Sequence, residues 1–460
     1  MAFGSLRDFI IRLENEGELK RVKAQVSLQY EIGGILRRIF DTKGPSLLLE
    51  NIEKYNTPIA VGLMSTLKRY SIALETSEDQ IGEKWQEALE RPIQPKTVNS
   101  GPCKEKIHLG VEVDLQEFPI PIWHELDGGP YISLGVCITQ DPETGIHNQA
   151  IYRLMPQSKN KCGILISPHQ HIGLHYAKYE ARNEPMPLAV AIGLDPTLYL
   201  TAVGELPYGT DHFTVAGGLR KNAVEVVKCE TCDLNVPSSA EIIIEGVVQP
   251  NLRAPEGPFG EFTGYYGPEG NRPVFEVTAI THRTKPIFQG TTEDKPPTES
   301  SLIRGMVKSA LLQRALNPIP GIIAVNVAEE CCSDFAVIVK MSPLYPGHTR
   351  QIMSAIWGTH VGGEAKLVIV VDEDINPFDL GNVMWAVTTR AQFDRDLHTW
   401  SSGLGMPLDP SQPSESKAIN AKMGIDATRS FKGLSFPTVA TPSEETMSKV
   451  LSRWDEYGIS

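Results

Sequence analysis

The segment Ala254-Pro-Glu-Gly-Pro-Phe-Gly-Glu-Phe262 carries two carboxylates five positions apart, Glu256 and Glu261. Pro258 and its neighbouring glycines exclude a regular helix and predict a tight loop. The runs 240–249 and 273–282, which flank this loop, are rich in β-branched residues and predict strands. Two carboxylates on a loop between strands suit general acid and base catalysis. An acidic surface loop explains the same residues, so the pair alone does not establish a function.

A second group of polar residues precedes this loop in the chain. Asn148 and Arg153 lie in one strand-like run, and their offset of five places them on opposite faces unless a bulge or turn intervenes. Arg153 could bind a carboxylate or a phosphate with two hydrogen bonds, or it could form a structural salt bridge. His171 and His175 share one face of an expected helix and could hold a divalent metal with Asn148.

Asp211 and His212 follow further along the chain, before the run Val215-Ala-Gly217. Histidine clusters are also common on protein surfaces, and none of these features identifies a site alone. Together they supply an amide, several imidazoles, a guanidinium and two carboxylates, which fits a metal-binding and anion-binding site.

These residues need a scaffold, and the chain of 460 residues is long enough for two or three domains. Alternating helical and strand patterns predict a small α/β domain over 1–107. Short runs punctuated by Gly and Pro predict a barrel or sandwich over 108–298, interrupted by a helix near 169–182. A helix over 299–315 then leads into a second α/β domain over 299–460. Thr441-Pro-Ser-Glu444 is expected to cap a last helix that extends to Trp454.

Composition excludes several classes of protein. The net charge of -13 argues against nucleic-acid binding, and no apolar run is long enough to span a membrane. The seven cysteines form no disulfide framework, which favours a reduced, cytoplasmic chain. Cys229-Glu-Thr-Cys232 is a lone CxxC, which two packed strand residues explain more simply than a zinc knuckle. The sequence contains no phosphate-binding P-loop, no Gly-x-Ser-x-Gly and no His-Glu-x-x-His.

Several segments together resemble the UbiD family of reversible aromatic and acrylic acid decarboxylases. The matching segments occur in the order of that family, and they are Asp127-Gly-Gly-Pro-Tyr-Ile132, Asn148-Gln-Ala-Ile-Tyr-Arg153, Gln170-His-Ile172, 234–246, Ala254-Pro-Glu-Gly-Pro-Phe-Gly-Glu261, Thr263-Gly-Tyr-Tyr266 and Lys422-Met-Gly-Ile-Asp-Ala-Thr428. The Ala-Pro-Glu-Gly-Pro-Phe-Gly-Glu element is highly specific to the family.

The resemblance implies an architecture, a cofactor and partners. The expected fold is an α/β multidomain protein: an N-terminal α/β domain, a central split β-barrel like that of flavin reductases, and a C-terminal α/β domain with a dimerisation tail. The expected cofactors are prenylated FMN, a divalent metal, usually Mn²⁺, and K⁺ at the phosphate. A flavin prenyltransferase supplies the cofactor in this family, and homodimers or homohexamers are usual. Loss of CO₂ from an sp² carbon requires an electron sink, which no side chain here provides.

The resemblance also assigns roles to residues. Glu261, Arg153 and Glu256 match the catalytic network of the family, with Glu261 as the acid that protonates carbon after CO₂ leaves. That role requires a neutral carboxyl, so we expect an apolar setting that raises the pKa of Glu261. The implied cofactor-binding residues are Asn148, Ile151, Tyr152, Arg153, Gln170, His171, His212 and Lys422.

One position departs from the family pattern. The implied metal ligands are Asn148, His171 and His212, but the family has Glu where this chain has His212. Imidazole suits Mn²⁺ less well than a carboxylate does, which leaves three alternatives: His212 is a ligand, Asp211 replaces it, or the metal is weak or different. The alternatives are an FMN-dependent oxidoreductase of the split-barrel type and a non-catalytic subunit of a larger carboxylase. The sequence does not identify which aromatic, heteroaromatic or α,β-unsaturated acid is the substrate.

Overall fold

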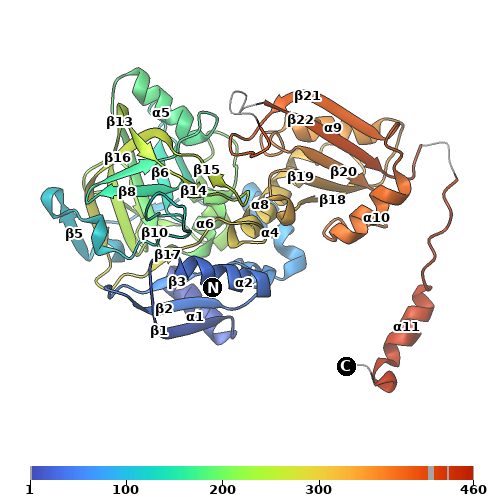
Figure 1. The fold of residues 1–460 in the computed structure, drawn as a ribbon, viewed down its shortest axis with the longest axis horizontal. Helices are drawn as coiled ribbons and strands as arrows, with labels where there is room; N and C mark the ends of the chain where they lie inside the picture. The colour runs from blue at the N-terminus through green and yellow to red at the C-terminus, as the bar shows by residue number, and fades with distance from the viewer. Residues whose placement is uncertain (1–2, 413–418, 432–434, 459–460) are drawn as a thin grey trace.

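The computed structural model describes residues 3–412, 419–431 and 435–458. Figure 1 shows a mixed α/β fold in which an N-terminal unit packs beneath a large central sheet, and a second α/β unit lies beside it. Helix α8 lies between the central sheet and the second unit, while helix α11 stands away from the body of the protein (Figure 1). The described helices include none that is long and apolar enough to cross a membrane.

The N-terminal unit is a four-stranded sheet covered by helices. Its first helix is capped by Ser5, whose side chain accepts a hydrogen bond from the backbone of Asp8, and Phe9 and Leu13 are buried. The last strand of the sheet comes from far along the chain and pairs with β3 in parallel, which the sequence did not predict. The elements are α1 (Leu6–Asn15), β1 (Leu19–Val26), α2 (Glu31–Thr42), β2 (Ser46–Ile52), β3 (Ile59–Val61), α3 (Leu67–Ala73), α4 (Ile81–Glu90) and β17 (Phe288–Gly290).

The central unit is an eight-stranded sheet in which the strands pair in the order β7-β6-β10-β13-β16-β9-β8, with β5 beside β16. This path is open, so the expected split barrel is not closed among the described residues. The elements of the sheet are β5 (Lys106–Leu109), β6 (Val136–Gln140), β7 (His147–Ile151), β8 (Leu154–Ser158), β9 (Lys161–Ile164), β10 (Met186–Ile192), β13 (Ile242–Glu256) and β16 (Gly270–His282). Smaller sheets contain β4 (Lys96–Thr97), β11 (Glu225–Lys228), β12 (Asn235–Pro237), β14 (Phe259–Gly260) and β15 (Tyr266–Gly267).

The predicted loop between two strands is shorter than expected. Strand β13 continues to Glu256 instead of ending at residue 249, and its pairing with β16 shifts register between Val248 and Arg253. Glu256 is therefore the last residue of a strand, whereas Glu261 follows the short strand β14. The prediction missed this extension because Pro250 and Pro255 interrupt the β-branched pattern.

Three helices cover the central sheet: α5 (His171–Ala181), α6 (Pro196–Val203) and α7 (His212–Arg220). Of these, α5 was predicted. Helix α7 contains Gly217 and Gly218, which disfavour a helix in isolation. In the structure a Cβ at Gly217 would lie 2.6 Å from the carbonyl oxygen of Ile93, and one at Gly218 would lie 2.7 Å from that of Ala88. Close packing against the end of α4 and the segment that follows it therefore requires both glycines.

The C-terminal unit is a five-stranded sheet in the order β18-β19-β20-β22-β21. Its elements are α8 (Glu299–Leu316), β18 (Ile322–Val327), β19 (Ala336–Met341), α9 (His348–Gly358), β20 (Leu367–Val371), α10 (Leu380–Arg390), β21 (Leu397–Leu404), β22 (Ile419–Ala427) and α11 (Glu444–Ser452). The cap of α11 is Ser443, not Thr441, and its side chain accepts a hydrogen bond from the backbone of Thr446. Trp454 lies in the following 3-10 turn, beyond the end of the helix.

Candidate active site

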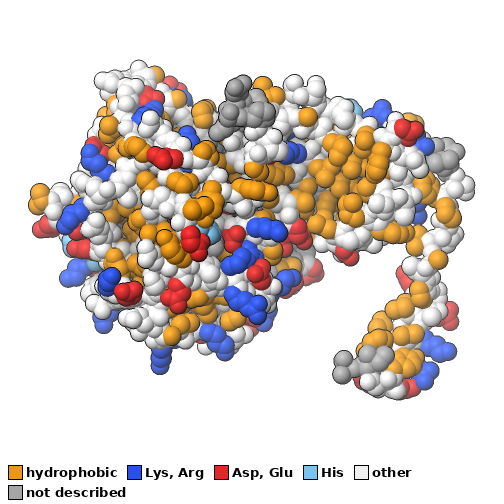
Figure 2. All heavy atoms as spheres, viewed as in Figure 1, with side chains coloured by type: hydrophobic (Ala, Val, Ile, Leu, Met, Phe, Trp, Pro, Cys, Tyr) orange, Lys and Arg blue, Asp and Glu red, His pale blue; other side chains and the backbone are white. Residues whose placement is uncertain are grey.

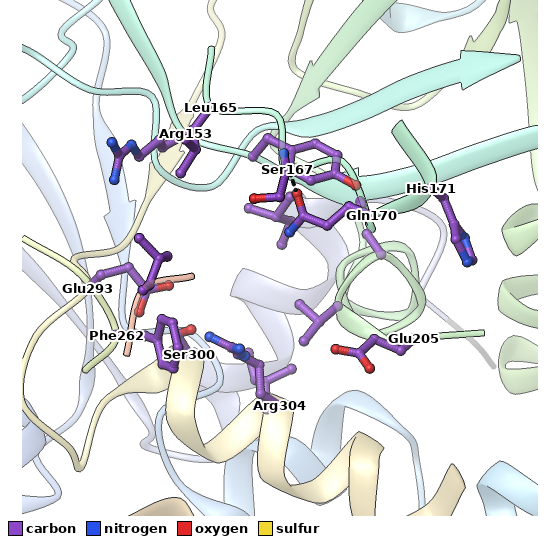
Figure 3. Close-up of a pocket in the computed structure, with 18 of the residues that line it drawn as sticks. Arg153, Leu165, Ser167, Gln170, His171, Glu205, Phe262, Glu293, Ser300 and Arg304 are labelled. Carbon is purple, nitrogen blue, oxygen red and sulfur yellow. Dashed lines mark hydrogen bonds between the residues drawn. The ribbon is translucent and has the colours of Figure 1, made fainter. Parts of the chain in front are cut away.

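A cavity of about 300 Å³ lies where the central sheet, α6 and α8 meet the C-terminal unit. Figure 3 shows Arg153, Gln170 and His171 on one side of this space and Glu293, Ser300 and Arg304 on another. The lining also contains Asn148, His212 and Glu261. The cavity therefore brings together residues that are widely separated in the sequence.

Arg153 joins the two carboxylates of the Ala254–Phe262 segment, Glu256 and Glu261. Its Nε and one terminal nitrogen donate to the two oxygens of Glu256 at 2.9 and 2.8 Å, and the other terminal nitrogen donates to Glu261. The exposed fractions are 8% for Arg153, 0% for Glu256 and 7% for Glu261. Buried charges require such pairing, so the three side chains form one fixed network.

A break between two strands explains how Arg153 reaches the cavity. Tyr152 and Arg153 form the connection between β7 and β8, so Asn148 and Arg153 do not lie in one continuous strand. This break allows both residues to line the same cavity, despite an odd offset that would separate them in a continuous strand.

Neighbouring residues hold the network in place. The Tyr131 hydroxyl donates to Glu256 at 3.0 Å, and the Arg153 guanidinium lies 5.3 Å from the centre of the Phe259 ring. Burial, and then the charge of Glu256, raise the pKa of Tyr131, which keeps its hydroxyl protonated as a donor. A Cβ at Gly163 would lie 2.9 Å from the Cγ of Glu256, so only glycine leaves room for the Glu256 side chain there.

Asn148, His171 and His212 line a second part of the cavity. The Nδ1 of His171 lies 3.3 Å from the Oδ1 of Asn148, and His171 and His212 begin helices α5 and α7. Burial lowers the pKa of each of these two histidines to about 4. Both rings are therefore neutral at neutral pH and have a lone pair for a metal.

The buried polar atoms in this part of the cavity fit a bound group. The Nδ2 of Asn148 and the Nδ1 of His212 have no hydrogen-bond partner among the described residues, and neither has the side chain of Gln149. Buried polar atoms rarely lack partners in folded proteins. The donor set of one amide and two imidazoles suits a divalent metal, although these ligands carry no negative charge.

The remaining predicted cofactor residues divide into two groups. Ile151, Tyr152 and Gln170 line the cavity, and the side chain of Gln170 accepts a hydrogen bond from the backbone of Ser167. Lys422 is not part of the lining, and its ammonium group donates to the carbonyls of Gly363, Ala365 and Leu404 at 2.6 to 3.0 Å. Burial lowers the pKa of Lys422 to about 8. A contact between Lys422 and a phosphate would require these bonds to be exchanged.

His175 also behaves differently from the expectation for a metal ligand. It is buried, its Nδ1 lies 3.0 Å from the hydroxyl of Thr139, and it is not part of the cavity lining. His175 therefore packs against β6, and His212 takes the place beside His171 that the sequence pattern gave to His175.

Sequence reasoning missed a buried charge network on the opposite wall. Lys308 contacts Glu205 at 2.6 Å and also contacts Asp334, which binds Arg304 as well. Burial alone would lower the pKa of Lys308, but the negative charges of Asp334 and Glu205 outweigh the effect of burial and raise the pKa. Arg304 and Lys308 are one turn apart on α8, a helix that is otherwise largely apolar. This pair of cations on one helix face was the sequence feature from which the network could have been predicted.

The C-terminal unit contributes residues that close the cavity. The ring of His360 stacks on that of His171 with 5.5 Å between the ring centres. His169 lies 3.2 Å from Glu364, and this hydrogen bond raises the pKa of His169. The site is therefore shared between the central sheet and the C-terminal unit.

Comparison with known proteins finds matches over nearly the whole chain. Three domain models of the family described as 3-octaprenyl-4-hydroxybenzoate carboxy-lyase match the chain. The N-terminal domain matches residues 10–89, the Rift-related domain matches residues 96–296 and the C-terminal domain matches residues 301–427. The chain belongs to the UbiD family. It is accordingly a carboxy-lyase, as the sequence predicted.

Solved UbiD-class structures share the fold. The enzyme HmfF from Pelotomaculum thermopropionicum, solved in complex with FMN, is 34% identical with a TM-score of 0.86, covering 96% of this chain and 98% of that one. An evolved dimeric form of HmfF in complex with prFMN is 32% identical with a TM-score of 0.85, covering the same shares of the two chains. The closed form of vanillic acid decarboxylase from Sedimentibacter hydroxybenzoicus is 28% identical with a TM-score of 0.90, covering 100% of both chains.

Proposed function

We propose that this UbiD-class carboxy-lyase removes CO₂ reversibly from an aromatic, heteroaromatic or α,β-unsaturated carboxylic acid. The observation that carries the proposal is the buried hydrogen bonding of Arg153 to Glu261, both of which line the cavity, and to the fully buried Glu256. Hydride transfer by an ordinary flavin needs no such network, so the geometry favours decarboxylation over the alternative oxidoreductase.

Each residue of the network has a role in the proposed reaction. Arg153 orients the substrate carboxylate and couples the two acids, while Glu256 holds the guanidinium in position. The bond between the carboxyl carbon and its sp² neighbour breaks, CO₂ leaves, and the electron pair stays with the substrate. Glu261, after taking a proton from water, gives that proton to the carbon.

Prenylated FMN, when bound, supplies the electron sink that this step requires. Asn148, Ile151, Tyr152, Gln170, His171 and His212 would hold it, with Mn²⁺ or another divalent metal at Asn148, His171 and His212 and K⁺ at the phosphate. The unpartnered polar atoms of Asn148 and His212 support this assignment. A flavin prenyltransferase would supply the cofactor, and the seven cysteines, all described and all free thiols, favour a reducing, cytoplasmic location.

Co-expression with a flavin prenyltransferase, followed by purification without oxygen, tests the proposal. The expected result is a released cofactor with the mass of prenylated FMN and one divalent metal per chain at this site. His212→Glu is the matched variant, and we expect it to bind Mn²⁺ more tightly because a carboxylate suits this metal better than an imidazole does. Plain FMN, or a site without flavin despite the partner enzyme, would contradict the proposal.

We also propose that the chain forms a homo-oligomer, a homodimer or homohexamer, through its C-terminal tail. Figure 2 shows hydrophobic side chains along the tail and over the C-terminal unit. Met447, Leu451 and Trp454 of the tail are exposed, and none of the residues of α11 is buried. Ile419 and Met423 point out of the exposed face of β22. Such apolar surface is typical of an interface.

Removal of residues 436–460 is expected to reduce the oligomer to a smaller species, because it deletes the exposed apolar face of α11. Light scattering of the full and shortened chains at equal concentration measures this. Equal masses for the two chains would show that the tail does not mediate assembly.

A further inference from the structure

The lone CxxC of the sequence lies in the turn that joins β11 to β12. The turn closes through a hydrogen bond from the backbone of Cys229 to the carbonyl of Leu234 at 2.9 Å. Cys229 is buried and Cys232 is half-buried. Two packed strand residues were the simpler interpretation from sequence, because a single CxxC provides only two ligands.

The structure places a third ligand beside the two thiols. Glu245, from the long strand β13, is completely buried. Its Oε2 accepts hydrogen bonds from the backbone of Glu230 and Thr231, the two residues between the cysteines, at 2.7 and 2.9 Å. Its Oε1 has no partner among the described residues. A buried carboxylate oxygen without a partner is costly, so this atom points to a missing ligand.

An irregularity in the sheet positions Glu245. The pairing of β13 with β16 shifts between Glu245 and Gly246, so that Thr278 lies opposite no residue of β13. The Thr278 hydroxyl lies 2.6 Å from that of Thr231 in the CxxC turn and donates to the carbonyl of Glu245 at 3.3 Å. Bulges of this kind redirect side chains. The turn and the strand are therefore joined around the three candidate ligands.

We propose that Cys229, Cys232 and Glu245 bind a zinc ion. One ligand atom from each lies within 4.8 Å of the other two. In a tetrahedral zinc site the bond lengths place ligand atoms about 3.6–3.8 Å apart, so small side-chain movements would close the site. Water completes the fourth position.

The chemistry of the ligands selects zinc. Thiolates are soft ligands that disfavour Mg²⁺, Ca²⁺ and Mn²⁺. Zinc binding would release the thiol protons to solvent, form the Zn–S and Zn–O bonds and change no oxidation state.

The site is structural and independent of the proposed function. None of its three ligands lines the cavity. The ion would tie the β11–β12 turn to β13, the strand that ends at Glu256. A variant that loses decarboxylation should still bind zinc at these three ligands. A variant that loses this zinc should keep the contact between Asn148 and His171.

Zinc analysis and cobalt substitution of the whole protein test the proposal. The ligands Asn148, His171 and His212 contain no sulfur, so a thiolate-to-cobalt charge-transfer band in the near ultraviolet reports only on cysteine ligands. We expect one thiol-bound zinc per chain and this band in the cobalt form. Cys232→Ser should abolish the band, and Glu245→Gln should raise the Co²⁺ concentration for half-saturation by at least about tenfold.

Cys331→Ser is the matched control, because it removes a half-buried cysteine of the C-terminal unit and should leave the band unchanged. The wild-type spectrum tests the proposal even if a variant fails to fold. Absence of the band in the wild-type protein would overturn the zinc site. A band that survives Cys232→Ser, or a Cys229–Cys232 disulfide in protein purified with reductant, would also overturn it.

Discussion

Glu261→Gln is expected to lower kcat by about 10²–10⁴-fold, the contribution usual for a positioned general acid. The amide has nearly the shape of the carboxyl group but cannot give a proton to the carbon that loses CO₂. Glu261 lies in the cavity lining and is 7% exposed, so water has little access to replace it as the proton donor. Steady-state decarboxylation and exchange of the substrate proton with deuterated solvent measure the loss.

Two controls separate this role from a loss of structure. The flavin spectrum of Glu261→Gln should match that of the wild type, since Asn148, His171 and His212 are unchanged. Glu269→Gln, on the same segment but exposed and outside the cavity lining, should keep wild-type turnover. Near-normal decarboxylation by Glu261→Gln would remove Glu261 as the proton donor.

The sequence predicted much of the fold because its elements have strong local patterns. The helix expected over 299–315, for example, became α8 and is stopped by Asn317-Pro318, and β20 of the expected second α/β domain is a short apolar run. Helices α6 and α7 escaped prediction for a physical reason. Helix α6 is buried over nearly its whole length and therefore shows no amphipathic pattern, and α7 tolerates two glycines only because it packs against α4.

The sequence predicted candidate residues of the site but not how they are arranged in space. The resemblance identified Glu256, Glu261 and Arg153 together, whereas their mutual hydrogen bonds depend on the break between β7 and β8 and on the extension of β13. The partners Glu205 and Asp334 of Lys308 come from different units, so no local pattern joins them. The same holds for Glu245, which contacts the CxxC turn only because the strands pair as they do.

Arg153→Met is expected to lower both activity and stability. Removing the guanidinium leaves Glu256 and Glu261 buried without their partner, and breaking a buried pair in this way costs about 3–5 kcal/mol of unfolding free energy. Arg253→Met is the matched control, because its ion pair with Glu180 at 2.8 Å is about one-third exposed and should cost no more than about 1 kcal/mol. Urea unfolding of the three proteins measures the difference.

A double variant separates the structural part of this effect from the catalytic part. In Arg153→Met with Glu256→Gln one of the two buried carboxylates becomes neutral, so part of the lost stability should return. Turnover should stay low, because the substrate carboxylate still has no guanidinium to orient it. Recovery of both stability and turnover would show that Arg153 acts only by neutralising Glu256. Unchanged stability in Arg153→Met would contradict the buried network itself.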